Sequence, residues 1–184
     1  MLPYFKVLQI SNLEQISQEV RNNLTQLLPD SHTRPYSFNL INEQDLLKIS
    51  PTLAAWLKSV GLYNHLQYAG LPLVAPHTVG PLHMDGKCKE AINLPVFNCG
   101  VGYSSWHTSS TLSGEILTTT DGVHTSKKAE YVSCVDDGVE LVRLENAHAA
   151  WVNTALPHKG TNTGKNPRMI MTLRFDRDID IDII

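Results

Sequence analysis

The sequence predicts an α+β protein that is mainly β, with helices before about residue 61 and strands after it. In the first third, apolar residues recur at the three- and four-residue spacing of an amphipathic helix. Beyond residue 62, short apolar runs are separated by Gly, Pro, Asn, Asp and Ser, as in an all-β sandwich or small barrel. We therefore expect two packed sheets, with the N-terminal helices against one of them.

The helical part divides into three segments. The first begins at Leu13 and continues to Leu28, where Pro29-Asp30 ends it. A second pattern begins near Asn42. Ser50 followed by Pro51 predicts the N-cap and first turn of a third helix, which Gly61 ends.

The remaining elements are short strands. A chain of 184 residues suits a single domain, which we divide into a helical part (1–61), a β core (62–176) and a tail (177–184) whose Asp and Ile residues alternate. The interval 104–126 is rich in Ser and Thr and predicts loops with one exposed strand. The predicted strands are 71–76, 90–97, 112–119, 130–134, 139–144, 150–155 and 168–175.

Composition excludes several classes of protein. The net charge of −3 and the pI of about 6.2 disfavour bulk nucleic-acid binding. No apolar run approaches the ~20 residues of a membrane span, and the N-terminus lacks a secretory signal pattern. The three cysteines, Cys88, Cys99 and Cys134, have no CxxC spacing. We expect a cytoplasmic protein with reduced thiols, acting on a small molecule or a protein side chain.

The tripeptide His83-Met84-Asp85 is the first candidate for chemistry. On a strand, positions i and i+2 point to the same face, so the imidazole and the carboxylate would lie side by side. Two histidines and one carboxylate on one face form the ligand set of non-heme Fe(II) oxygenases. The tripeptide therefore predicts part of a metal site, which a second histidine would complete.

His158 supplies that second histidine, and Gly, Asn and Pro residues follow it. If these residues form a hairpin centred near Thr163, Arg168 lies across from His158 and on the same face. Its guanidinium could then bind the far carboxylate of a short dicarboxylate that chelates the metal. Arg174 lies about 20 Å further along the strand, so we expect it to be remote from the metal.

With these residues, the chain resembles the Fe(II)/2-oxoglutarate-dependent oxygenases, although no subfamily is matched. The resemblance covers roughly residues 66–176 and implies a double-stranded β-helix, the jelly-roll or cupin-like fold. It implies that His83, Asp85 and His158 bind Fe(II) and that Arg168 binds the cosubstrate 2-oxoglutarate. The residue two positions after the arginine, small and hydroxylated in the family, is Ile170 here. If Asn93 faces inward, its amide could bind 2-oxoglutarate; otherwise it is a buried, structurally satisfied amide.

Two other hypotheses remain open. One is a cupin-type metal enzyme without 2-oxoglutarate, because Gly80-x-x-His83-x-Asp85-x4-Glu90 and His158-x3-Asn162 loosely follow the two cupin motifs. Glu90 discriminates between them, as a ligand in a cupin and a bystander in an oxygenase. The other is a jelly-roll binding module in which the His-x-Asp is coincidental.

Overall fold

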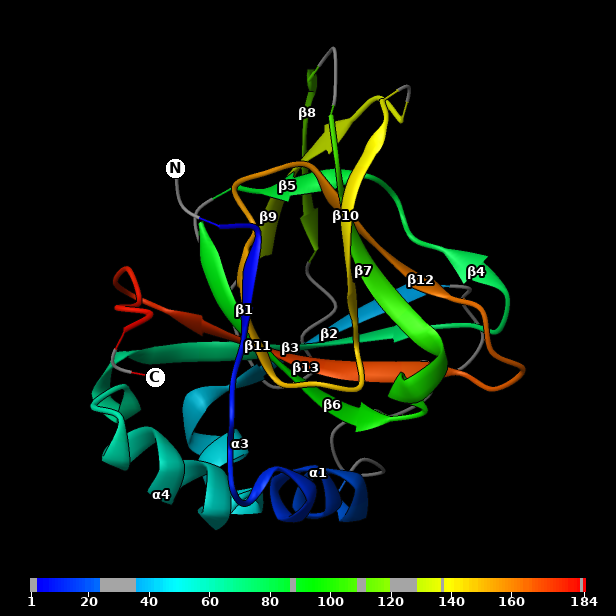
Figure 1. The fold of residues 1–184 in the computed structure, drawn as a ribbon. Coiled ribbons are helices and arrows are strands. Elements are labelled where there is room, and N and C mark those ends of the chain that lie inside the picture. The colour runs from blue at the N-terminus through cyan, green and yellow to red at the C-terminus, as the bar shows by residue number, and fades with distance from the viewer. Residues whose placement is uncertain are drawn as a thin grey trace.

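The computed structural model describes residues 3–23, 36–86, 89–108, 112–119, 129–136, 138–182 and 184. These residues form two antiparallel sheets with helices gathered on one side of the first (Figure 1). The helices are α1 (Leu13–Asn22), α3 (Glu43–Ile49) and α4 (Pro51–Ser59), with short 3-10 turns η2 (Tyr63–His65) and η3 (Cys99–Val101). The strands are β1 (Phe5–Val7), β2 (Tyr36–Asn42), β3 (Leu66–Val74), β4 (Thr78–Val79), β5 (His83–Asp85), β6 (Glu90–Phe97), β7 (Gly102–His107), β8 (Leu112–Thr119), β9 (Ala129–Cys134), β10 (Glu140–Glu145), β11 (Ala150–Asn153), β12 (His158–Asn162) and β13 (Arg168–Phe175).

The strand order is that of a double-stranded β-helix, as predicted. The first sheet has the order β1-β11-β6-β13-β3-β2, and the second has β10-β7-β12-β5-β9-β8, with β4 paired to β12. From β5 to β7, and again from β10 to β13, successive strands lie in opposite sheets. Such crossing connections close two sheets into a jelly roll. The strands β8 and β9 are inserted between the two halves and widen the second sheet.

The first sheet has one face against the helices and one toward the second sheet. In β13, Met169, Met171, Leu173 and Phe175 belong to the helix-side core, which also contains residues of α1, α3 and α4. Because side chains alternate along a strand, Arg168, Ile170, Thr172 and Arg174 point into the barrel. A smaller apolar cluster between the sheets contains Ala91, Trp106, Leu144, Ala150 and Val152.

The helix boundaries in the second and third segments are confirmed. Asn42 caps α3 by accepting a hydrogen bond from the Asp45 N–H. Ser50 caps α4 through the Leu53 N–H, and Pro51 opens that helix. Gly61 follows α4 with a φ of +72°, in the left-handed region that favours glycine. In the first segment α1 covers Leu13–Asn22, and the predicted end at Pro29-Asp30 lies outside the described residues.

Three sequence predictions are wrong in part. The segment 1–61 is not only helical, because it contains β1 and β2, which form the two edges of the first sheet. The interval 104–126 does not begin with a loop: β7 lies in the interior of the second sheet, between β10 and β12. The strand expected at 150–155 ends at Asn153, and β12 begins only at His158.

The described part of the tail, 177–182 and 184, forms no strand. Instead Ile179 is buried in the helix-side core, and Ile181 and Ile184 pack against it. Among the described residues, no helix combines the length and the apolar character that a membrane crossing would require.

Candidate metal centre

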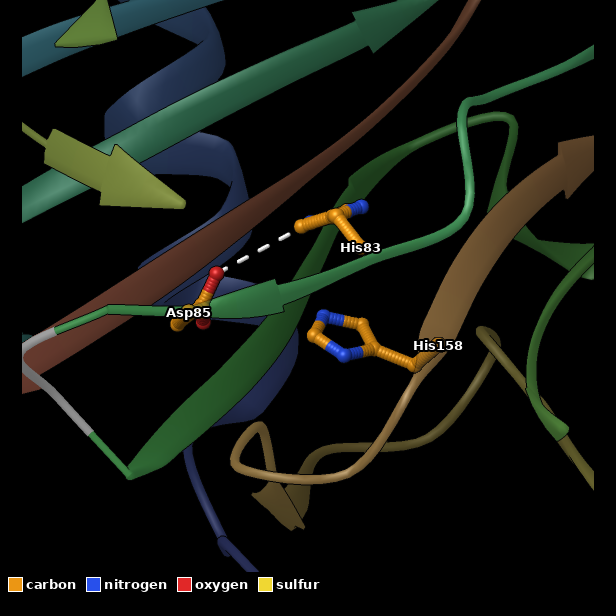
Figure 2. A group of neighbouring side chains, drawn as sticks. All are labelled: His83, Asp85 and His158. Atoms are coloured by element: carbon orange, nitrogen blue, oxygen red, sulfur yellow. Dashed lines mark ion pairs between the residues drawn. The ribbon is translucent and has the colours of Figure 1, made fainter. Parts of the chain in front are cut away.

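Two neighbouring strands of the second sheet position the predicted ligands. His83 and Asp85 occupy alternate positions of β5, so both point into the barrel. His158 opens β12 and pairs directly with His83 across the ladder. Figure 2 shows the three side chains turned toward a common space, two from β5 and one from β12.

The geometry of this group suits a metal ion. One ligand atom from each residue lies within 4.8 Å of the others, and the two imidazole centroids are 4.5 Å apart. His83 Nδ1 is 2.8 Å from the Pro81 carbonyl oxygen, and His158 Nδ1 is 2.9 Å from that of Leu156. A proton on each Nδ1 donates to these carbonyls, so each Nε2 keeps its lone pair for a metal, the usual arrangement of metal-binding histidines.

The charge state also suits a metal. Burial opposes ionisation of Asp85, but the guanidinium of Arg174, the two histidines and a hydrogen bond from Thr154 together outweigh burial and hold the pKa of the carboxyl below its usual range. Burial, together with His83, lowers the pKa of His158 to about 4. At neutral pH the cluster therefore presents an ionised carboxylate and a neutral His158 imidazole, the forms that bind divalent metals.

The prediction that Arg174 is remote from the site is wrong. Its Nη2 lies 2.5 Å from Asp85 Oδ2, and its Nη1 donates to Thr154 Oγ1 at 3.0 Å. The error came from the assumed hairpin, since β12 and β13 do not pair and lie in opposite sheets. The strand β13 therefore runs across the barrel from the site, and both of its inward arginines reach the second sheet.

Arg168 is buried, with 2% of its surface exposed, and crosses the barrel toward β7 and β12. A Cβ atom on Gly160 would lie 3.0 Å from Arg168 Nη2, and one on Gly102 would overlap the side chain. Gly160 and His158 share a face of β12, two residues or about 7 Å apart. The Arg168 guanidinium thus lies beside Gly160, and the separation of Gly160 from His158 along β12 is one that a short ligand could span.

Two other predicted residues have contrasting surroundings. Asn93 lies on β6, and its Oδ1 is buried with no hydrogen-bond partner among the described residues. Glu90 is not part of the group of potential ligands. Its Oε2 accepts hydrogen bonds from Trp151 Nε1 at 3.2 Å and from the Ile179 N–H at 2.8 Å. Glu90 is a bystander to the three-residue group, so the additional cupin ligand is not supplied by this residue.

Sequence analysis did not anticipate two residues beside the site. Thr154 hydrogen-bonds the Asp85 carboxylate through its side chain and accepts the Asp85 N–H at its carbonyl, at 2.9 Å. Tyr131, on β9 opposite Asp85, has its ring edge toward His83 with centroids 5.4 Å apart. Neither belongs to a motif: the pairing of β9 with β5 brings Tyr131 to the site, and the turn after β11 brings Thr154.

The strand order and the three converging side chains define a double-stranded β-helix, the jelly-roll fold, with a candidate metal centre. No protein-family model matches the sequence, and no curated protein is significantly similar to it.

Solved structures similar to this chain include two single-site variants of Bacillus subtilis oxalate decarboxylase and a plant protein. The first variant, with tyrosine in place of a tryptophan, is 12% identical over 78% of this chain and 26% of its own, with a TM-score of 0.40. The second, with alanine in place of a serine, is 11% identical over 80% and 27%, with a TM-score of 0.40. The vicilin from Solanum melongena is 10% identical over 83% and 32%, with a TM-score of 0.44. This chain thus spans about a quarter to a third of these proteins.

Proposed function

We propose that this protein is an Fe(II)- and 2-oxoglutarate-dependent oxygenase that hydroxylates its substrate. The observation that supports this most is the combination of a His-Asp-His ligand group with a buried arginine, Arg168, that reaches across the barrel to Gly160, two residues after His158 on β12. Two histidines and one carboxylate leave coordination positions open for a chelating cosubstrate and dioxygen.

The residues that line the site fit both Fe(II) and 2-oxoglutarate. His83, Asp85 and His158 would hold Fe(II), because each offers a nitrogen or oxygen atom of the kind that binds this ion. Arg168 would bind the C5 carboxylate of 2-oxoglutarate, since Gly102 and Gly160 leave room for its side chain across the barrel. The buried Oδ1 atom of Asn93 has no partner among the described residues, and the amide N–H of this side chain is our candidate for a second contact to 2-oxoglutarate.

When bound, Fe(II) with 2-oxoglutarate and dioxygen supplies the oxidising chemistry, in which 2-oxoglutarate becomes succinate and CO2 and the substrate gains a hydroxyl group. The contribution of the chain is to bind and orient. His83, Asp85 and His158 would hold the ion, and Arg168 would orient the dicarboxylate along the barrel. The two sheets shield this space from water, which prevents side reactions.

A cupin-type metal enzyme without 2-oxoglutarate is the second candidate. The observation that favours it is the position of Arg174, a second arginine that points into the barrel and contacts the carboxylate of Asp85. Its guanidinium could also bind a small carboxylate substrate on the metal. Imidazole and carboxylate ligands suit several divalent metals, Mn(II) among them, so the ligand group does not by itself require iron. This candidate predicts metal binding without any response to 2-oxoglutarate.

The decisive experiment is an anaerobic titration of the protein with Fe(II) and then 2-oxoglutarate, monitored for the weak visible charge-transfer band of the chelate. We expect the band in the wild type, followed by succinate release when oxygen is admitted. Arg168→Ala should weaken 2-oxoglutarate binding by about 1.5–3 kcal/mol with little effect on Fe(II) binding. Arg168→Lys should recover only part of the lost 2-oxoglutarate affinity, because lysine offers a point charge rather than the planar, two-pronged guanidinium of arginine.

The exposed Arg177→Gln is the matched control and should behave as wild type. A wild type that binds metal but gives neither band nor succinate would favour the second candidate. A protein that binds neither Fe(II), Mn(II) nor Ni(II) would favour a non-catalytic binding module.

A further inference from the structure

The two oxygens of Asp85 have different surroundings. Oδ1 lies 3.8 Å from His83 Nε2, on the side of the metal-ligand group. Oδ2 lies 2.5 Å from Arg174 Nη2. A carboxylate can bind a metal through one oxygen or through both. The partner of Oδ2 therefore decides how many coordination positions Asp85 occupies.

Arg174 is itself fixed in place. The residue is 6% exposed and comes from β13, on the opposite sheet from Asp85. Its Nη1 donates to the hydroxyl of Thr154, and this side chain also hydrogen-bonds the Asp85 carboxylate. The Thr154 carbonyl in turn accepts the Asp85 backbone N–H at 2.9 Å. Three separate segments, β5, β13 and the turn after β11, thus converge on one carboxylate.

We propose that Arg174, supported by Thr154, is a positioning residue that makes Asp85 a one-oxygen metal ligand. The ion pair occupies Oδ2, so only Oδ1 would be available to a bound metal, and other coordination positions would stay open for other ligands. Charge-assisted contacts in a desolvated site are strong, so a metal would have to displace the guanidinium to use both oxygens. This inference rests on the metal half of the proposed function and is independent of 2-oxoglutarate.

Coordination geometry is a better readout of this role than metal affinity for variants of Arg174. Removing the guanidinium loosens the ligand, which weakens metal binding, as loss of an outer-shell partner usually does. It also removes a positive charge near the ion, which strengthens binding. The two effects oppose each other in the affinity, whereas only the first changes how the carboxylate binds.

The test uses Co(II) as a spectroscopic probe of the full-length protein, without 2-oxoglutarate. Co(II) absorbs more weakly in the visible as its coordination number increases. We expect Arg174→Gln to weaken and shift the visible bands relative to wild type, because both oxygens of Asp85 become available. Arg174→Lys should give an intermediate spectrum, since a lysine can hold one oxygen. The exposed Arg177→Gln, in the segment just after β13, should give the wild-type spectrum.

Thr154→Val keeps the charge of Arg174 and provides a second test should Arg174→Gln fail to fold. It removes only the supporting hydroxyl, so we expect Mn(II) affinity to fall by about 10-fold, measured by calorimetry. A wild-type Co(II) spectrum in Arg174→Gln, or wild-type Mn(II) affinity together with a wild-type spectrum in Thr154→Val, would overturn the positioning role. A wild type that ignores 2-oxoglutarate would overturn the proposed function and leave this inference standing.

Discussion

Gly102 of β7 and Arg168 of β13 are in contact across the barrel, and a Cβ atom on Gly102 would overlap the arginine side chain. The backbone of Gly102 is extended, with a φ of −133°, a conformation that any residue adopts. A side chain is therefore excluded at this position by its neighbours, chiefly Arg168 and also the Thr161 carbonyl oxygen, and not by the conformation of Gly102 itself.

This contact predicts that Gly102→Ala displaces Arg168, and a Cβ there also crowds the Thr161 carbonyl oxygen of β12 at 2.9 Å. We expect 2-oxoglutarate affinity to fall by about 10-fold or more, the equivalent of a lost charge-assisted contact, while Mn(II) affinity stays at the wild-type value. Titration calorimetry with each ligand measures both. Gly100→Ala is the control, because a Cβ there meets nothing within 4 Å. Equal 2-oxoglutarate affinity in Gly102→Ala and wild type would argue against a role for Arg168.

Single alanine substitutions of His83, Asp85 and His158 should each abolish most metal binding. Loss of an outer-shell partner typically costs 10–100-fold in affinity, so loss of a direct ligand should cost more than about 100-fold. Circular dichroism should show a retained fold, since the three side chains lie outside both apolar clusters. Mn(II) titration followed by electron paramagnetic resonance measures the affinity.

In the same Mn(II) titration, Glu90→Gln distinguishes the ligand set of His83, Asp85 and His158 from the cupin set, which also includes Glu90. Glu90 binds Trp151 and the Ile179 N–H, so its substitution should change stability and leave Mn(II) affinity unchanged. A large loss of affinity in Glu90→Gln would restore the four-ligand cupin hypothesis.

Much of the fold was predictable because several strands have their own local signal. The strands β6, β8 and β13 have the predicted bounds, since each is a run of apolar and β-forming residues between turn residues. The strands β7 and β12 were missed because their sequences are polar or turn-like. Ser104 and Ser105 of β7 are buried by the strands on either side, which no local pattern reveals.

The ligand group was predictable and the arginine geometry was not. His83 and Asp85 share a face of any strand, so that inference needed only the two-residue period. Placing Arg174 required knowing that β12 and β13 lie in opposite sheets, and the local preference for hairpins gave the wrong pairing. The two-residue period of a strand placed Arg168 and Arg174 on one face of the strand. Only the order of the strands in the two sheets shows that this face lines the candidate metal site.

Glu19 of α1 docks onto the start of α4, and its substitution should destabilise the helical layer. Its carboxylate accepts hydrogen bonds from the Ser50 hydroxyl at 2.7 Å and from the Thr52 N–H at 3.2 Å. We expect Glu19→Gln to lower the free energy of unfolding by about 1 kcal/mol at pH 7, as for loss of a helix cap. Urea unfolding measures this. Glu14→Gln, which breaks only an exposed ion pair with Arg21, should cost close to nothing.

The effect of Glu19 should also depend on pH. Burial raises the pKa of its carboxyl, but the hydrogen bonds from Thr52, Ser50 and Gln15 together outweigh burial and lower it from the usual 4.5. The contribution of the Glu19 carboxylate to the free energy of unfolding is therefore present above about pH 4.5. It is lost as the pH falls through the lower pKa that Glu19 has in the folded protein. The difference between wild type and Glu19→Gln should shrink in acid. A constant difference down to about pH 3 would contradict this account.

His158 should make the metal-free protein less stable between about pH 6.5 and 4. Its pKa is near 6.5 in the unfolded chain and about 4 in the folded one, because of burial and the neighbouring His83. In this interval the unfolded chain binds a proton that the folded chain does not, so the free energy of unfolding decreases as the pH falls. The lowered pKa of Asp85 acts only below its ordinary value of 3.8, outside this interval. Urea unfolding in the presence of a chelator should therefore show a shallower pH dependence across this interval for His158→Gln than for wild type. Identical slopes would mean that folding does not lower the pKa of His158.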